Sequence, residues 1–166
     1  MMQTPKIIIL LGISGCGKGT QAKLLMDKFE LEYVGSGDLL RERIRLDDFT
    51  GKKMKEVLSR GDFAPTSIIF GLWLQRWEYL KAKQDFKGFV IDGSPRKLIE
   101  AKLIDQTLQW YEWENYLKVV LLDVSHTEAY KRLSERGRND DTPNSINSRL
   151  GLFEKEVKPV VDYYEN

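Results

Sequence analysis

The chain carries the stretch Gly12-Ile13-Ser14-Gly15-Cys16-Gly17-Lys18-Gly19-Thr20 between an apolar run at 6–11 and a stretch with helical periodicity at 20–29. A continuous apolar run is typical of a parallel strand that is covered on both faces. Glycines let backbone N–H groups turn inward around an anion, and a helix N-terminus adds partial positive charge. With Lys18 as a point charge, the spacing G-x-x-x-x-G-K predicts a phosphate-binding P-loop. The alternative is a glycine-rich turn with an incidental lysine, which the flanking strand and helix disfavour.

Strands and helices alternate along the rest of the chain. Further strands are expected at 33–34, 88–91 and 118–123, and helices at 38–45, 52–60, 67–83, 98–114, 128–136 and from 145 to about 164. This order predicts an α/β protein with the three-layer P-loop fold, a parallel sheet flanked by helices. Ligands of such sheets bind outside the carboxyl ends of the strands. Unusual residues follow three of the predicted strands there, at 12–18, 35–38 and 92–96.

Composition limits the classes of function. The 166 residues suit one domain, and 26 basic residues against 25 acidic ones give a net charge of +1, which argues against nucleic-acid binding. A single cysteine, Cys16, cannot form an intrachain disulfide and indicates a reducing compartment, hence the cytoplasm. The apolar run Ile7–Leu11 is too short to span a membrane, so no membrane association is expected.

Five segments, in order along nearly the whole chain, share a further pattern. They are the Gly17-Lys18-Gly19-Thr20 end of the loop, Ser36–Arg41, Gly61–Pro65, Gly88–Arg96, and Arg138–Asp141 followed by Arg149-Leu150. Together they resemble the adenylate kinase family of nucleoside-monophosphate kinases. The resemblance implies one P-loop kinase domain over 1–166, with an acceptor-binding insert at 35–62 and a short lid at 136–141. It also implies transfer of the γ-phosphoryl group of ATP to a nucleoside monophosphate, most simply AMP, with Mg²⁺ as cofactor and a monomeric enzyme.

The resemblance also implies roles for individual residues. ATP would be bound by Gly15, Cys16, Gly17, Lys18, Gly19, Thr20 and Arg132. The acceptor would be bound by Ser36, Arg41, Ala64, Gly93, Arg96 and Glu100. The transferring phosphoryl group would be stabilised by Lys18, Arg96, Arg136, Arg138 and Arg149, Mg²⁺ would be held through water by Asp92, and the lid would be organised by Asp140 and Asp141.

The chemistry of phosphoryl transfer fits this division, because the reaction needs in-line positioning and cations more than covalent help. Taken alone, the arginines on predicted helices have another interpretation, since such side chains usually lie in solvent. That alternative applies to Arg132, Arg136 and Arg149. No general base is needed, and the one histidine, His126, is interpreted as structural or solvated.

Glu100 departs from the family pattern, because adenylate-specific members carry a glutamine there. A glutamine can both donate to and accept from adenine, whereas an ionised carboxylate only accepts. Glu100 therefore suggests weaker AMP preference and acceptance of GMP or another base with an amino group. The alternative is a solvent-facing helix residue with no part in selectivity.

Three other departures concern the lid, the loops and the end of the chain. The lid is about four residues shorter than in common short-lid members, which raises the risk of ATP hydrolysis. Ser14 and Ser94 replace a proline and an aromatic residue, which opens the acceptor pocket. Family members usually continue into a fifth strand and a last helix. We therefore expect the fourth strand to be a sheet edge, covered by the final helix, an oligomer or a longer chain.

Two rival functions remain at this point. One is a P-loop kinase with a non-nucleotide acceptor, which the pair Arg41 and Arg96 disfavours because it implies a phosphorylated acceptor. The other is a degenerate nucleotide-binding module, which would not need the arginine set of Arg136, Arg138 and Arg149.

Overall fold

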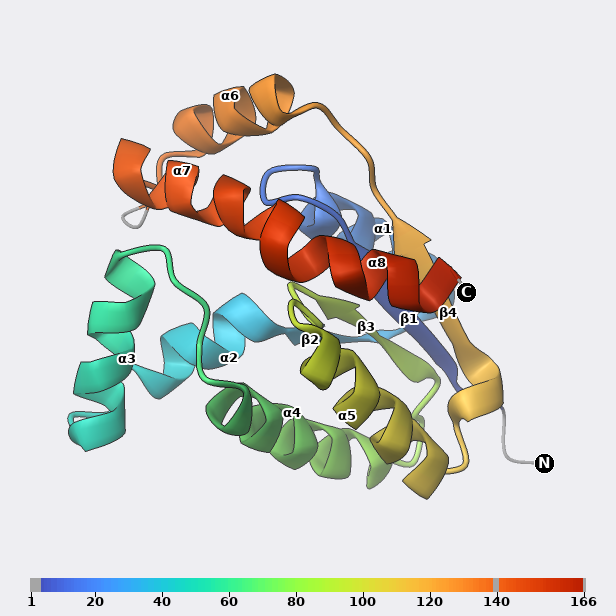
Figure 1. Cartoon of the computed structure of the whole chain (residues 1–166). Coiled ribbons are helices and arrows are strands. Elements are labelled where there is room, and N and C mark those ends of the chain that lie inside the picture. Colours follow the sequence, from blue (N-terminus) through green and yellow to red (C-terminus); the bar gives the residue numbers. More distant parts are fainter. Residues whose placement is uncertain (1–3, 139–140, 166) are drawn as a thin grey trace.

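The computed structural model describes residues 4–138 and 141–165 (Figure 1). The predicted strand, glycine-rich loop and helix are present as β1 (Lys6–Leu11) and α1 (Lys18–Phe29). The other strands are β2 (Glu32–Gly35), β3 (Gly88–Asp92) and β4 (Leu117–Leu121). The other helices are α2 (Ser36–Arg43), α3 (Phe49–Ser59), α4 (Thr66–Lys81), α5 (Leu98–Trp110), α6 (His126–Arg136), α7 (Pro143–Leu152) and α8 (Lys158–Glu165), with a 3₁₀ turn at Glu114–Tyr116.

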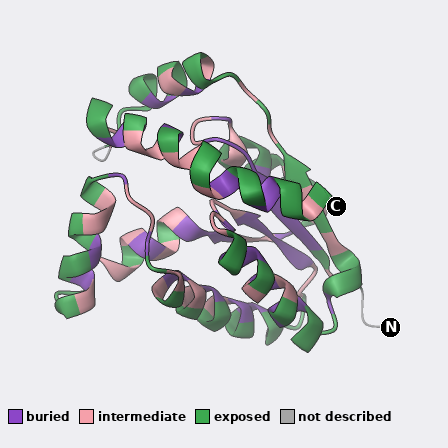
Figure 2. Ribbon diagram, in the orientation of Figure 1, coloured by how far each residue is buried: buried purple, intermediate pink, exposed green. Residues whose placement is uncertain are grey.

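The four strands are parallel and lie in the order β2-β3-β1-β4, which confirms the predicted α/β class. Because successive side chains point to opposite faces of a strand, β1 contributes side chains to two hydrophobic cores. Ile7 and Ile9 join the core under α4, α5 and α8, whereas Ile8 and Leu10 join the core under α1. Figure 2 shows buried residues in the sheet and along the inward faces of these helices. The sheet and its two helical layers form the predicted three-layer arrangement.

Helix α4 supplies the largest buried side chains. Trp73 and Trp77 lie four residues apart, on one face of the helix, and each is 1% exposed. Trp77 stacks on Phe89 of β3 with ring centroids 5.0 Å apart. This contact fixes α4 against the sheet beside the start of α2.

The expected single helix at 145–164 is interrupted. Thr142 caps α7 in a reciprocal capping box with Ser145, so the helix begins at Pro143. A π turn then spans Phe153–Val157 before α8 begins. Such turns occur often at functional sites, so this break in the helix marks a segment of interest.

Strand β4 lies at the edge of the sheet, as expected. Leu117 and Val119 pack against the core that contains Val160 and Val161 of α8, so the final helix covers one face of the strand. Val120 is 41% exposed, and among residues 4–138 and 141–165 β4 pairs with β1 alone. The helix therefore covers the face of β4 but leaves its outer edge without a strand partner in the described chain.

Helices α2 and α3 project from the end of β2 and form the region predicted as the acceptor-binding insert, at the lower left of Figure 1. The chain leaves α3 at Gly61, whose φ is 79°. A Cβ there would lie 2.7 Å from the carbonyl oxygen of Ser145, so the end of this region touches the start of α7. The division of the chain into insert and lid stays a prediction.

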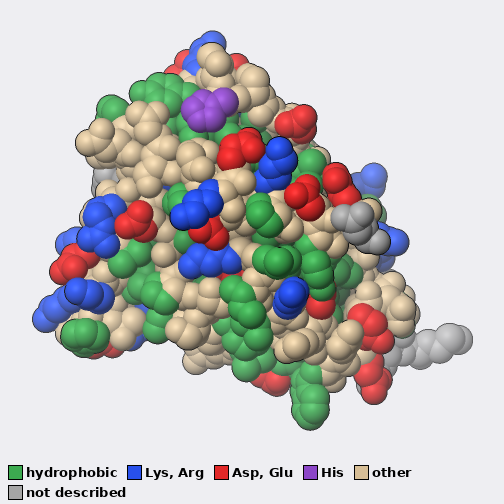
Figure 3. Space-filling model, in the orientation of Figure 1, with side chains coloured by type: hydrophobic (Ala, Val, Ile, Leu, Met, Phe, Trp, Pro, Cys, Tyr) green, Lys and Arg blue, Asp and Glu red, His purple; other side chains and the backbone are tan. Residues whose placement is uncertain are grey.

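Basic and acidic side chains are interspersed on the face shown in Figure 3. None of the helices within the described residues has both the length and the apolar composition needed to cross a bilayer.

Candidate functional site

The glycine-rich loop turns tightly between β1 and α1. Gly15 and Gly17 have φ values of 88° and 102°, a backbone conformation that favours glycine. A Cβ on Gly15 would lie 2.6 Å from the carbonyl oxygen of Ala129, so α6 packs directly against the loop. Glycine is therefore required at this position both for the turn and for the packing of α6.

Lys18, in the first turn of α1, folds back over the loop. Its Nζ donates to the carbonyl oxygens of Gly12 at 2.7 Å and Ile13 at 2.9 Å, and lies 3.5 Å from the Sγ of Cys16. Burial lowers the pKa of the Lys18 ammonium, and the nearby Cys16 and Asp92 oppose that shift. The side chain thus lies over the loop, where an anion held by the backbone N–H groups would meet it.

Cys16 and the end of the loop differ in exposure. Cys16 is 6% exposed and packs with Ile13, Ala129 and Leu133, which supports the interpretation of a small residue that fits its site. Gly19 and Thr20 lie in the first turn of α1, and both are exposed. The Thr20 hydroxyl is therefore open to a ligand from solvent.

Arg96 follows β3 and is held by three contacts. Its Nε donates to the carbonyl oxygen of Gly93 at 2.7 Å, and its guanidinium lies 4.8 Å from the ring centroid of Phe63. Its backbone N–H donates to Oε2 of Glu100 at 2.7 Å. Arg96 is therefore oriented by the protein before any ligand arrives.

Three arginines influence one another in this region. Burial lowers the pKa of Arg96; Glu100 and Asp92 oppose this shift, and the positive charges of Arg149 and Arg41 add to it. An anion bound near Arg96 would offset this excess of positive charge. The arrangement suits a ligand with several phosphate groups.

Glu100 is 2% exposed, so the solvent-facing alternative is wrong. Its carboxylate lies at the start of α5, where it accepts from the backbone of Arg96. Burial raises the pKa of Glu100, against the effects of the Arg96 backbone hydrogen bond and of the charges on Arg96 and Lys97. The carboxyl group thus holds the backbone of Arg96 and is a buried titratable group beside the pocket.

A buried hydroxyl pair stands beside Arg96. The Oγ atoms of Ser36 and Ser94 lie 2.5 Å apart, and the indole Nε1 of Trp73 donates to Ser36 Oγ at 3.0 Å. Both serines are at most 3% exposed, and Ala64, the residue after Phe63, is 6% exposed. The predicted acceptor residues Ser36 and Ala64 are therefore buried near the contacts of Arg96, and Ser94 ties the α2 and β3 ends together.

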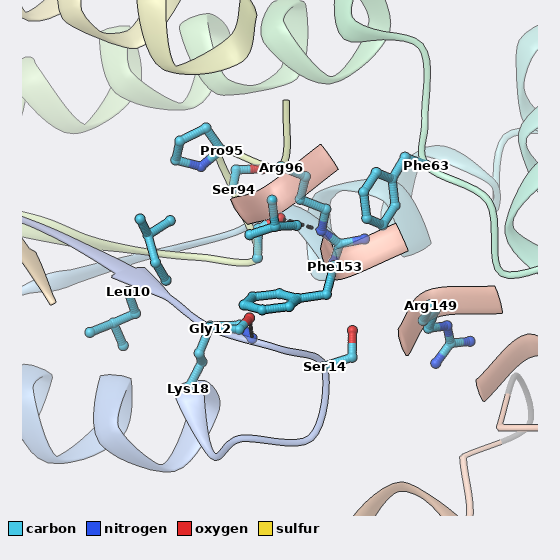
Figure 4. A pocket seen from close by; sticks show the side chains of 13 residues that line it. Leu10, Gly12, Ser14, Lys18, Phe63, Ser94, Pro95, Arg96, Arg149 and Phe153 are labelled. Atoms are coloured by element: carbon cyan, nitrogen blue, oxygen red, sulfur yellow. Dashed lines mark hydrogen bonds between the residues drawn. The ribbon is translucent and has the colours of Figure 1, made fainter. Parts of the chain in front are cut away.

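One pocket at the carboxyl ends of the strands brings several predicted residues together. Lys18, Gly93, Arg96 and Arg149 all line it (Figure 4). The stick view shows Arg96 and Lys18 on opposite sides of this space, with Arg149 at its rim. The pocket thus has cationic side chains on two of its sides.

Asp141 ends the region predicted as the lid, and its side chain is 1% exposed. Its Oδ1 accepts from Arg149 Nη1 at 2.8 Å, and its two oxygens accept from Arg136 at 2.7 and 2.8 Å. Although burial raises the pKa of Asp141, the hydrogen bonds and charges of Arg136 and Arg149 leave it below its usual range. Asp140, predicted to share this role, lies outside the described residues.

Four predicted arginines do not line this pocket: Arg136, which pairs with Asp141, and Arg41, Arg132 and Arg138. Arg132 pairs with Glu128 at 2.7 Å on the exposed face of α6, and Arg138 is exposed in the lid. Arg41 pairs with Asp38, although its charge still reaches Arg96. Their predicted roles stay predictions.

Asp92 ends β3 beside the phosphate loop. Its Oδ2 accepts from the hydroxyl of Tyr33 at 2.9 Å, and it would lie 3.6 Å from a Cβ on Gly19. Magnesium usually binds through one or two carboxylates together with water and substrate phosphates. A single carboxylate beside the loop would suit Mg²⁺ that arrives with a nucleotide. Residues 4–138 and 141–165 contain no group of three metal-ligating side chains.

Sequence reasoning missed four residues of the site: Tyr33, Phe63, Phe153 and Val157. Phe63 lies inside the segment Gly61–Pro65 that resembles the family, and Tyr33 lies on the strand predicted at 33–34. Phe153 and Val157 gave no signal, because apolar residues on a predicted helix are ordinarily assigned to the core.

Comparison with known proteins identifies the relatives of this chain. A family model described as adenylate kinase matches residues 10–166. The chain is 35% identical over 161 residues to an adenylate kinase of Corynebacterium urealyticum, covering 95% of this chain and 85% of that protein. It is 36% identical over 162 residues to an adenylate kinase of Xanthomonas axonopodis (95% and 84% covered), and 31% over 201 residues to one of Chlamydia muridarum (99% and 79% covered).

Proposed function

Because the chain belongs to the adenylate kinase family and is a nucleoside-monophosphate kinase, we propose that it transfers the γ-phosphoryl group of ATP to AMP, giving two ADP. The observation that carries this proposal is the shared pocket of Lys18, Arg96 and Arg149, beside the phosphate loop. Arginine forks suit the oxygens of a transferring phosphoryl group and of an acceptor phosphate. The pair of anion sites favours two nucleotides over a single bound one.

Separate groups of residues bind ATP, bind the acceptor and neutralise charge in the proposed reaction. The loop from Gly15 to Thr20 holds the phosphates of ATP, and Lys18 supplies a charge near them. Arg96, with Arg41, holds the acceptor phosphate, while Arg149 and the lid arginines Arg136 and Arg138 neutralise charge on the group in transfer. Mg²⁺ bound near Asp92 would neutralise phosphate charge when it arrives with ATP.

We infer that Glu100 sets the base preference through its protonation state. The neutral carboxyl group can donate and accept, as a glutamine does, and so can pair with adenine. The ionised carboxylate only accepts, which suits the amino groups of guanine or cytosine. Since burial raises the pKa of Glu100 while Arg96 and Lys97 oppose the shift, the neutral form is easier to populate than in an exposed glutamate.

The chain is further proposed to act as a monomer in a reducing, cytoplasmic compartment. The support is its one cysteine, which is buried in the loop against α6. Sedimentation of the purified protein would test the monomer, with a dimer mass as the contradicting result.

The test of the function is a phosphotransfer screen. Protein with Mg²⁺ and ATP is offered AMP, GMP, CMP, UMP and dTMP separately, and diphosphate products are quantified between pH 5 and 8. We expect AMP to be used best, and the ratio of kcat/KM for AMP to that for GMP to fall as pH rises. The Glu100→Gln variant should keep a high, pH-independent ratio. If the ratio in the wild-type protein does not change with pH, Glu100 does not select the base. If no acceptor yields a diphosphate, the proposed kinase activity is wrong.

A further inference from the structure

Three residues at four-residue spacing line the pocket from the C-terminal helices. Arg149 belongs to α7, and Phe153 and Val157 begin and end the π turn that follows. All three line the same pocket as Lys18 and Arg96. In Figure 4, the ring of Phe153 lies between the phosphate loop at Gly12 and the guanidinium of Arg96. An apolar side chain thus lies beside both predicted phosphate sites.

The π turn explains why both apolar residues reach the pocket. In a regular α-helix, residues four apart are rotated by about 40°, so a stripe at this spacing drifts away from one line. The backbone N–H of Lys158 donates to the carbonyl oxygen of Phe153, the five-residue spacing of a π turn. Because a π turn holds more than four residues, four residues fall short of a full turn there, so Val157 rotates back toward the line of Arg149 and Phe153.

Phe153 is also attached to the phosphate loop. It packs against the cluster that contains Ile13 and Cys16 of the loop and Leu150 of α7. Val157 is 7% exposed and lines the pocket beside it. The ring is therefore held in place by the loop and by its own helix.

The lid provides little apolar cover in comparison. Arg136, Gly137 and Arg138 are all exposed, and they bring charge and backbone rather than an apolar surface. Water that enters beside the γ-phosphoryl group competes with the acceptor, so a phosphotransferase has to exclude it. Something other than the described part of the lid has to close this side.

We propose that Phe153, backed by Val157, is the apolar wall that keeps water from the phosphoryl group during transfer; this rests on the proposed function of the pocket. In transfer, an acceptor phosphate oxygen forms a bond to the γ-phosphorus as the bond to the β,γ-bridging oxygen of ADP breaks. In hydrolysis, a water oxygen forms that bond instead and gives ADP, phosphate and a proton. The ring has no donor or acceptor with which to hold such a water in line.

The test is a graded series, Phe153→Leu, Phe153→Val and Phe153→Ala, with Leu152→Ala as the matched control. Leu152 is the preceding residue and does not line the pocket. Phosphate release from Mg²⁺–ATP is measured without acceptor, and the ratio of phosphate to diphosphate product is measured with AMP. We expect the ratio to rise with the volume removed, by about tenfold in Phe153→Ala, and not to change in Leu152→Ala.

Two outcomes would contradict the proposal that Phe153 excludes water. One is that hydrolysis and transfer fall together in every variant, with their ratio unchanged, which is the behaviour of a residue that only packs. The other is that the control raises the ratio as much as Phe153→Ala. If Phe153→Ala does not fold by thermal melting, the Leu and Val variants carry the test. Failure of the wild-type protein to use any acceptor would contradict the kinase alone, because the hydrolysis rates without acceptor still measure the shielding.

Discussion

The proposed acceptor side of the pocket is held by hydrogen bonds to Arg96, whereas the arginines predicted for the ATP side do not line the pocket. Arg96 is fixed by Gly93, by Phe63 and by the carboxylate of Glu100, which accepts from its backbone N–H. On the other side, Arg132 and Arg138 are exposed. We therefore propose that the acceptor site is organised before binding, while the ATP side is completed by the ligand and by closure of the predicted lid.

Replacing Arg96 by lysine should have the largest effect on turnover. Lysine keeps the charge but loses the fork and the Nε bond to Gly93, so we expect kcat/KM to fall by about 10² to 10³. Steady-state kinetics with ATP and AMP would measure this. The control is Arg45→Lys, at an exposed position outside the pocket. A fall of less than fivefold would show that the acceptor side is not organised around Arg96.

Replacing Asp141 tests the buried part of the lid. Asp141→Asn leaves Arg136 and Arg149 without their shared carboxylate, and we expect unfolding to become easier by about 3 kcal/mol near neutral pH. The exposed pair Glu128–Arg132 provides the control, since Glu128→Gln should cost less than about 1 kcal/mol. Denaturant unfolding of both variants would measure the difference.

The pH dependence of this effect follows from the lowered pKa of Asp141. A carboxyl group whose pKa is lower in the folded state stabilises the fold above its unfolded pKa of about 3.9. That contribution disappears as pH falls through the lower folded value. The gap between wild type and Asp141→Asn should therefore be full at pH 5 and above and shrink below pH 4. A gap that stays constant to pH 2 would contradict the ion pairs as its cause.

The sequence was enough to predict the sheet, the phosphate loop and the residues that follow strand ends, because glycines and charges directly after apolar runs are rarely needed for packing alone. The positions and partners of individual arginines could not be predicted from the sequence. Arg132 and Arg149 look alike as helical arginines, yet one lies in solvent and the other lines the pocket and pairs with Asp141. Their difference depends on where α6 and α7 pack, which is a tertiary property. Phe153 was missed for the same reason, because the π turn that directs its side chain toward the pocket is not visible in the hydrophobic periodicity of the sequence.

The bond from Tyr33 to Asp92 extends the organised side of the pocket to the proposed metal position. The hydroxyl donates to a carboxylate oxygen at 2.9 Å, which fixes the rotamer of Asp92. We expect Tyr33→Phe to raise the Mg²⁺ concentration needed for half-maximal activity by about three- to tenfold, with little change in thermal stability. The control is Tyr163→Phe, which removes an equivalent bond to Asp105, a residue that does not line the pocket. Calorimetric titration of ATP with and without Mg²⁺ should show a loss confined to the metal-bound nucleotide. An equal loss in both would mean that Tyr33 supports the fold of the site and not the position of the metal.

Replacing Arg132 should have the smallest effect, because this side chain is exposed and already paired with Glu128. Contact between an exposed guanidinium and the adenine ring of ATP would contribute about 0.5–1 kcal/mol to binding. Arg132→Gln should therefore raise KM for ATP about two- to fivefold without changing kcat. Lys131→Gln, the neighbouring exposed cation, should leave both constants unchanged. A large fall in kcat would place Arg132 among the groups that act on the phosphoryl group in transfer. The ATP side would then contribute to the chemical step to the same extent as Arg96, and its exposure would reflect a site that closes only around the nucleotide.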